Sequence, residues 1–160
     1  MLKPNDKFPS ITIRPPEGAA LELPGAPGGG FCVVLFFRGA WCPYCNAQLR
    51  AFQRAQNKLS ELEIKVVALS VDDAATTREL IQKHSLTFPV GHSADARAVA
   101  LDTGAFVNDD PLYLQSTGFV LAPDGRVVVS VYSSGAIGRL LPEDIVGMLR
   151  RVRQHTPAAS

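Results

Sequence analysis

Two cysteines separated by two residues are the part of the sequence best suited to chemistry, within the segment Trp41-Cys42-Pro43-Tyr44-Cys45. Residues three apart in the first turn of a helix are neighbours, so the two sulfurs can reach disulfide geometry with small adjustment. With Cys42 at the N-cap, Pro43 occupies the first helical position, where its missing N–H costs nothing. The pattern predicts a reversible dithiol/disulfide pair where a helix begins.

The position in a helix also predicts the reactivity of the two thiols. Unpaired backbone N–H groups and the helix dipole lower the pKa of a thiol at this end. Arg38, four residues before Cys42, is placed to add positive charge. Cys45 shares the inward helix face with Leu49, so we expect Cys45 to be buried and Cys42 to be more exposed and better placed to attack. Trp41 is expected to shield the pair or to form a docking surface for a partner.

Two cysteines can also form half of a zinc site, but a structural zinc ion needs about four ligands. The remaining candidates are Cys32 and the histidines His84, His92 and His155, which show no paired spacing. Cys32 lies within an apolar run and is expected to serve only packing. We therefore predict neither a metal nor a cofactor, and a metal-binding module is the alternative that elemental analysis would test.

Composition indicates an ordinary globular chain of 160 residues, with 46% hydrophobic and 19% charged residues. Its length suits a single domain over residues 1–160. The net charge of +1 gives no reason to expect nucleic acid or an anionic membrane as a partner. The N-terminus lacks a signal-peptide pattern, and the longest apolar run, residues 31–37, is too short to span a bilayer. We expect a cytoplasmic protein with reduced cysteines.

Apolar periodicity predicts the elements that position the pair. They are strands over 11–13 and 21–23, a loop over 25–30 predicted to be mobile, a buried strand over 31–37, a helix over 43–59, a strand over 64–71, a helix from Asp73 to His84, a short strand over 88–90, a short helix over 94–101, a hairpin of strands 117–121 and 126–132, and a helix from Pro142. A βαβ unit, then a hairpin and a closing helix, is the order of a thioredoxin fold. The predicted class is therefore α/β, a central mixed sheet flanked by helices, with an N-terminal β-hairpin extension.

Residues 36–49, FFRGAWCPYCNAQL, resemble the active-site segment of peroxiredoxin-like proteins of the alkyl hydroperoxide reductase/thiol-specific antioxidant family. Weaker similarities follow in the same order, at residues 66–72 (VVALSVD), 86–90 (LTFPV), 118–121 (GFVL) and 123–126 (PDGR). The resemblance covers roughly residues 8–152. It implies a thioredoxin fold and an antioxidant or disulfide-exchange role.

The resemblance gives the cysteines two different roles. Thioredoxins attack with the first cysteine of such a pair, which corresponds to Cys42. Peroxiredoxins use the position of the second, which corresponds to Cys45. The family's Thr or Ser three residues earlier and its Pro seven residues earlier correspond here to Cys42 and Arg38. The sequence leaves open which thiol attacks.

The chain departs from both patterns near the late hairpin. Peroxiredoxins bring an arginine from this region to the thiolate, whereas Gln115, Ser116 and Thr117 stand here, so no arginine is expected at the sulfur. The cis-proline of thioredoxins is replaced by the segment 116–118, and their buried aspartate by Phe36. These absences favour disulfide exchange as the reaction, whereas the overall resemblance favours the reduction of a peroxide.

Together these observations predict an enzyme, a thiol-based antioxidant oxidoreductase that cycles between the Cys42–Cys45 dithiol and disulfide. Arg38, Trp41, Pro43 and Tyr44 are the expected supporting residues. The expected partners are a peroxide or disulfide substrate and a thioredoxin-type or low-molecular-weight thiol donor, and a homodimer is an assembly to test. The alternative is a redox-sensing binding protein whose disulfide changes a surface without catalytic turnover.

Overall fold

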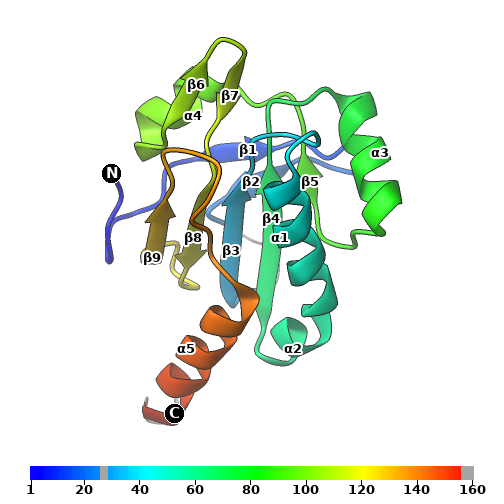
Figure 1. Cartoon of the computed structure of the whole chain (residues 1–160). Coiled ribbons are helices and arrows are strands. Elements are labelled where there is room, and N and C mark those ends of the chain that lie inside the picture. Colours follow the sequence, from blue (N-terminus) through cyan, green and yellow to red (C-terminus); the bar gives the residue numbers. More distant parts are fainter. Residues whose placement is uncertain (26–28, 156–160) are drawn as a thin grey trace.

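The protein is built on a five-stranded mixed sheet in the order β5-β4-β3-β8-β9, as a computed structural model shows for residues 1–25 and 29–155 (Figure 1). The strands are β3 (Phe31–Phe36), β4 (Ile64–Leu69), β5 (Val90–Gly91), β8 (Thr117–Leu121) and β9 (Val127–Tyr132). β3 pairs in parallel with β4 and antiparallel with β8, so both neighbours flank its end at Phe36. The predicted fold class and the predicted late hairpin are confirmed. Residues 26–28 of the predicted loop lie outside the described residues.

Five helices accompany the sheet within the described residues: α1 (Pro43–Arg54), α2 (Gln56–Glu61), α3 (Ala74–His84), α4 (Ala96–Thr103) and α5 (Pro142–His155). Successive residues of β3 face opposite sides of the sheet, as strand geometry requires. Val33 and Leu35 pack in one core cluster with residues of α1, α2, α3 and α5. Cys32 and Val34 pack in a second cluster with residues of α4 and the N-terminal segment. The sheet therefore lies between two apolar layers, and Cys32 is on the side away from Cys42 and Cys45.

Two small hairpins lie outside the central sheet. β1 (Ile11–Ile13) and β2 (Leu21–Leu23) pair antiparallel, which confirms the predicted N-terminal hairpin. β6 (Val107–Asp109) and β7 (Leu112–Leu114) form a second hairpin, which the sequence analysis missed. Each of its strands is only three residues long, and β6 has no buried residue, so apolar alternation gives almost no signal there.

Several predicted boundaries differ from those of the structure, including the ends of β4 and α4, and two of the differences have a clear physical cause. The helix predicted over 43–59 ends at Arg54, because the N–H of Ala55 is shared between the carbonyls of Ala51 and Phe52 and a new short helix, α2, begins at Gln56. The edge strand predicted over 88–90 is limited to Val90–Gly91. Pro89 has no N–H to donate, and it contributes only its carbonyl, which accepts from the N–H of Ala68.

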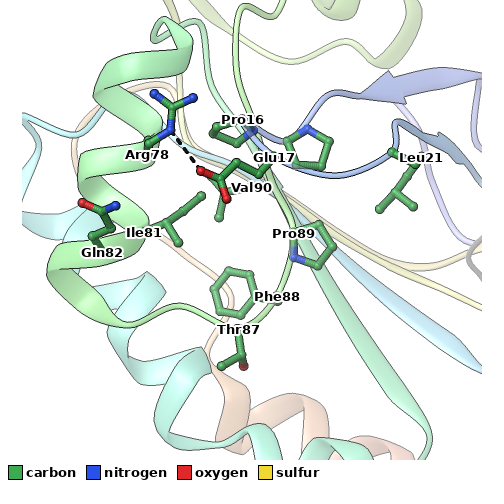
Figure 2. A pocket seen from close by; sticks show the side chains of 12 residues that line it. Pro16, Glu17, Leu21, Arg78, Ile81, Gln82, Thr87, Phe88, Pro89 and Val90 are labelled. Atoms are coloured by element: carbon green, nitrogen blue, oxygen red, sulfur yellow. Dashed lines mark ion pairs between the residues drawn. The ribbon is translucent and has the colours of Figure 1, made fainter.

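A pocket of about 380 Å³ lies between α3 and the connection of the N-terminal hairpin (Figure 2). Its lining is largely apolar, and Arg78 and Glu17 form an ion pair at 3.4 Å beside it. No cysteine lines this pocket, so it is separate from the thiol pair. Among the described residues, no helix is both long enough and apolar enough to cross a membrane.

The packing of α1 onto the sheet predicts a large loss of stability for Leu49→Ala. Leu49 is fully buried in the first core cluster, and removing such a side chain leaves a cavity that costs about 2–5 kcal/mol. Leu101→Ala on α4 is the matched control, because Leu101 is 86% exposed and its loss should change the free energy of unfolding by less than about 0.5 kcal/mol. Urea unfolding of both variants measures the difference. Equal losses would contradict this account of the core.

Candidate active site

The cysteine pair follows a short loop that leaves the end of β3. The N–H of Phe37 donates to the carbonyl of Leu69 at 3.0 Å, which extends the pairing with β4 by one residue. Asp72, just beyond β4, accepts a 2.8 Å hydrogen bond from the N–H of Ala40. The side-chain amide of Asn46 donates to the Ala40 carbonyl at 3.0 Å. The loop is therefore anchored to both β4 and α1.

Helix α1 begins as the sequence predicts. Cys42 is the N-cap residue, and Pro43 occupies the first helical position. The Cys42 sulfur accepts a hydrogen bond from the N–H of Cys45 at 3.4 Å, in the way that a capping side chain does. Because the N–H of Cys45 points at this sulfur and the sulfur lies at the positive end of the helix dipole, the geometry favours its anionic form.

Two arginine guanidinium groups converge on the sulfurs. Arg38 Nη1 lies 3.8 Å from Cys42 Sγ, and Arg139 Nη2 lies 3.7 Å from the same sulfur. Arg139 Nη2 is also 3.1 Å from Cys45 Sγ, and the backbone N–H of Arg38 donates to Cys45 Sγ at 3.3 Å. Both thiols therefore face donors from two parts of the chain that lie about a hundred positions apart in sequence.

Cys42 is fully buried, so the expectation that it would be the more exposed thiol was wrong. The guanidinium groups of Arg38 and Arg139 lie against its sulfur and contribute to this burial. Cys45 is also fully buried, which confirms its predicted position on the inward face of α1. The exposed residues of the motif are instead the aromatic ones, Trp41 and Tyr44, with 57% and 53% of their surface exposed.

Aromatic rings hold both arginines in place. The Arg38 guanidinium carbon lies 4.9 Å from the centre of the Trp41 ring and 5.2 Å from that of Tyr113. Arg38 also donates to the Tyr113 hydroxyl at 2.9 Å, and the Trp41 and Tyr113 rings meet edge to face. Arg139 lies over the Tyr44 ring at 5.9 Å. Such cation–π contacts orient a guanidinium group without neutralising its charge.

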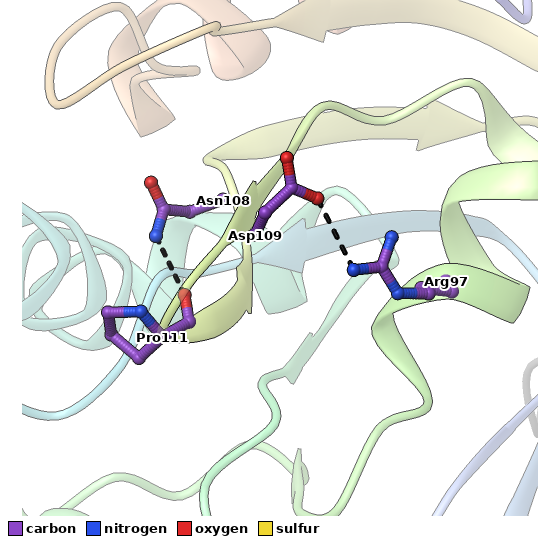
Figure 3. A network of polar contacts seen from close by, with 4 residues as sticks. All are labelled: Arg97, Asn108, Asp109 and Pro111. Carbon is purple, nitrogen blue, oxygen red and sulfur yellow. Dashed lines mark hydrogen bonds and ion pairs between the residues drawn. The ribbon is translucent and has the colours of Figure 1, made fainter.

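Tyr113 is supplied by the β6–β7 hairpin, and its ring is almost fully buried. An ion pair between Arg97 on α4 and Asp109 at 3.3 Å joins this hairpin to the helix (Figure 3). Asn108 donates to the carbonyl of Pro111 at 2.7 Å and closes the turn. The small hairpin thus places a tyrosine that positions Arg38.

Arg139 lies on the segment between β9 and α5. The Ser133 hydroxyl donates to the carbonyls of Gly135 and Ile137 within this segment. The buried side-chain amide of Gln48, on α1, donates to the Leu140 carbonyl at 3.1 Å. These bonds fix the segment next to the first turn of α1, where Arg139 reaches both sulfurs.

The environments of the thiols give them different proton affinities. Burial alone would raise the pKa of Cys42, but hydrogen bonds from Cys45 and Arg38 and the charge of Arg139 bring it below the ordinary thiol value. Burial and the hydrogen bond to Cys42 raise the pKa of Cys45. Burial raises the pKa of Cys32 to about 12, which keeps it protonated and agrees with a packing role. Cys42 is therefore the thiol of the pair that loses its proton more readily.

The structure brings together all six residues that the sequence singled out, Arg38, Trp41, Cys42, Pro43, Tyr44 and Cys45. The expectation that no arginine reaches the sulfurs was wrong. It was based on positions 115–117, whereas the arginine comes from position 139. Tyr113 was missed as well, because nothing in its sequence neighbourhood distinguishes it.

Iodoacetamide reacts with the thiolate, so the rate of alkylation of each cysteine should rise with pH around the pKa of that cysteine. We predict a midpoint below the ordinary thiol pKa for Cys42 and a midpoint above it for Cys45. Tyr113→Phe should move the Cys42 midpoint upward, since Arg38 loses its hydroxyl anchor. Tyr132→Phe is the matched control, because its hydroxyl contacts Leu2 and Thr103 instead. Peptide mapping by mass spectrometry gives each midpoint. An unmoved Cys42 midpoint in Tyr113→Phe would contradict the positioning role.

Comparison with known proteins agrees with this geometry. The model of the AhpC/TSA family matches residues 4–130. A peroxiredoxin of Methanothermobacter thermautotrophicus is 30% identical over 154 residues, which cover 92% of this chain and 72% of the relative. The thiol-disulfide oxidoreductase ResA of Bacillus cereus is 26% identical over 149 residues, which cover 90% of this chain and 75% of that protein.

Solved structures show the same fold. The crystal structure of peroxidoxin BcpB from Mycobacterium tuberculosis superposes with a TM-score of 0.81 at 19% identity, covering 96% of this chain and 99% of that one. The relatives include both peroxiredoxins and thiol-disulfide oxidoreductases, which share thiol chemistry and differ in the substrate they are named for. The chain belongs to the AhpC/TSA family and is a thiol-based oxidoreductase.

Proposed function

We propose that the protein reduces a small peroxide at the Cys42–Cys45 pair, with Cys42 as the attacking thiolate and Cys45 as the resolving thiol. The observation that carries this proposal is the convergence of two guanidinium groups on a fully buried sulfur at a helix N-terminus. Burial limits access to small molecules, and the positive groups favour both the thiolate and the charge that develops on a peroxide oxygen.

The reaction has two chemical steps. In the first, the Cys42 thiolate attacks one peroxide oxygen, the O–O bond breaks, and the departing oxygen takes up a proton and leaves as water or an alcohol. Cys42 is then a sulfenic acid. In the second step, the Cys45 sulfur attacks Cys42, a disulfide forms, and the hydroxyl leaves as water. An external thiol donor returns the two electrons and restores both thiols.

The arginines give the departing oxygen the stabilisation that a peroxide reductase needs. Arg38 and Arg139 lie within 3.8 Å of Cys42 Sγ, so they are adjacent to the position of the scissile O–O bond. Cys42 and Arg38 stand at the positions where the resemblance places the family's hydroxyl residue and its proline, and both belong to this site. Arg38 thus replaces the usual proline, and Cys42 replaces the usual hydroxyl residue. Arg139 provides the second arginine beside the sulfur, the role that peroxiredoxins give to an arginine from the region of the late hairpin.

Disulfide exchange is a second candidate that the structure supports with a different observation. A cysteine at the N-cap, with proline and one more residue before a second cysteine, is the arrangement of thiol-disulfide oxidoreductases. Trp41, just before the motif, and Tyr44, within it, are both exposed. The proposed donor for either reaction is a thioredoxin-type or low-molecular-weight thiol. Three cysteines are too few for a disulfide framework and fit a reducing compartment such as the cytoplasm, and a homodimer is the proposed assembly to test.

Cysteine variants test the two-thiol cycle in a steady-state assay with hydrogen peroxide and a thioredoxin-type donor. Cys42→Ser and Cys45→Ser should each lower turnover by at least about a hundredfold, because each removes a reacting atom. Cys32→Ser is the matched control and should retain turnover, because Cys32 lies across the sheet from the pair.

Full activity in either active-site variant would overturn the two-thiol mechanism. Turnover of a protein disulfide but not of peroxide would select the second candidate. Oxidation of the pair without repeated turnover with any donor would favour the redox-sensing alternative.

A further inference from the structure

The two arginines at the thiol pair have no acidic partner within the described part of the chain. The ion pairs among residues 1–25 and 29–155 involve other side chains, and neither Arg38 nor Arg139 takes part in one of them. Asp72 bonds to the same loop, but through the N–H of Ala40. The Nε atoms of both arginines are buried and have no hydrogen-bond partner among the described residues. When Cys42 is ionised in the reduced protein, its sulfur is the negative group that faces these two guanidinium groups, at 3.8 and 3.7 Å.

Formation of the disulfide removes this negative charge. A Cys42–Cys45 disulfide is neutral, whereas Arg38 and Arg139 keep their charges. Two partly buried cations without a counter-ion are unfavourable next to one another, so the oxidised site has a stronger preference for an anion than the reduced site. In the oxidised state, the ring faces of Trp41, Tyr44 and Tyr113 keep the two guanidinium groups beside the disulfide.

We propose that the oxidised site binds an anionic small thiol, one that carries a carboxylate, as its reductant. The carboxylate pairs with Arg38 and Arg139 and brings the thiolate of the same molecule to the disulfide. The inference rests on the proposed function in one respect, which is that Cys42 and Cys45 form a disulfide. It concerns the reductive half of the cycle and does not depend on which oxidant made that disulfide.

The exchange consumes two thiol molecules. The first thiolate attacks one sulfur of the pair, a mixed disulfide forms as the Cys42–Cys45 bond breaks, and the electron pair stays on the released cysteine. A second thiolate attacks the mixed disulfide and leaves as a small symmetrical disulfide, and protons from solvent complete the two-electron reduction. Both sulfurs are buried, which favours a small reductant over a bulky one.

A charge series of small thiols tests this proposal on protein that has been oxidised with diamide. The probes are 3-mercaptopropionate, 2-mercaptoethanol and cysteamine, which are anionic, neutral and cationic but similar in size. Their rates of disulfide reduction are measured per thiolate by acid quench and intact mass, and each is divided by the rate of the same thiolate with a small neutral disulfide, because a more basic thiolate is intrinsically more nucleophilic. The anionic thiol should react about tenfold faster than the neutral one, and the cationic thiol should be the slowest. Added potassium chloride should reduce the differences in rate among the three thiols, because salt screens the charges.

Arg139→Gln should reduce the preference for the anionic thiol, whereas Arg78→Gln should retain it. Arg78→Gln is a suitable control because it also removes one positive charge, but from a residue beside the separate pocket of Figure 2. Equal rates for the three thiols, or a faster cationic thiol, would overturn the proposal while leaving the dithiol cycle intact. If diamide yields no Cys42–Cys45 disulfide, the proposed function fails, and the anion site of the oxidised pair fails with it.

Discussion

The interaction on which the rest of the site depends is the approach of two guanidinium groups to one buried sulfur. Arg38 and Arg139 reach Cys42 Sγ at 3.8 and 3.7 Å, and the N–H of Cys45 reaches it at 3.4 Å. A buried thiol would normally stay protonated, because burial disfavours charge. These donors lower the pKa of Cys42 below the ordinary thiol value, whereas burial and the hydrogen bond to Cys42 raise that of Cys45. The division of roles between two thiols in one helical turn follows from where the donors lie.

Each part of the fold contributes one constraint to this arrangement. β3 and β4 fix the loop that carries Arg38, and α1 supplies the helix terminus. The β6–β7 hairpin provides Tyr113, which holds Arg38, and the segment after β9 provides Arg139. The sheet keeps Cys32 in the opposite apolar layer, where its raised pKa leaves it unreactive. The site is therefore assembled from four separate segments of the chain around a rigid core.

The sequence predicted the features that depend on local chemistry. Cys42 and Pro43 define the start of a helix by their own conformational preferences, and the apolar run before them is a buried strand for the same reason. Arg139 and Tyr113 could not be found in this way, because they meet the sulfurs only through tertiary packing. The burial of Cys42 depends on those long-range contacts, so the expectation of an exposed thiol was wrong for the same physical reason. The break at Ala55 has no glycine or proline to mark it.

The central claim is that this arginine-bound pair reacts with peroxide, and rapid mixing of reduced protein with hydrogen peroxide tests it most directly. Trp41 is the only tryptophan and is adjacent to Cys42, so its fluorescence reports oxidation of the pair. We predict oxidation much faster than that of free cysteine at the same pH, with an intact mass that shows one Cys42–Cys45 disulfide. Oxidation no faster than that of free cysteine would contradict the peroxidase assignment and leave disulfide exchange as the reaction of this site.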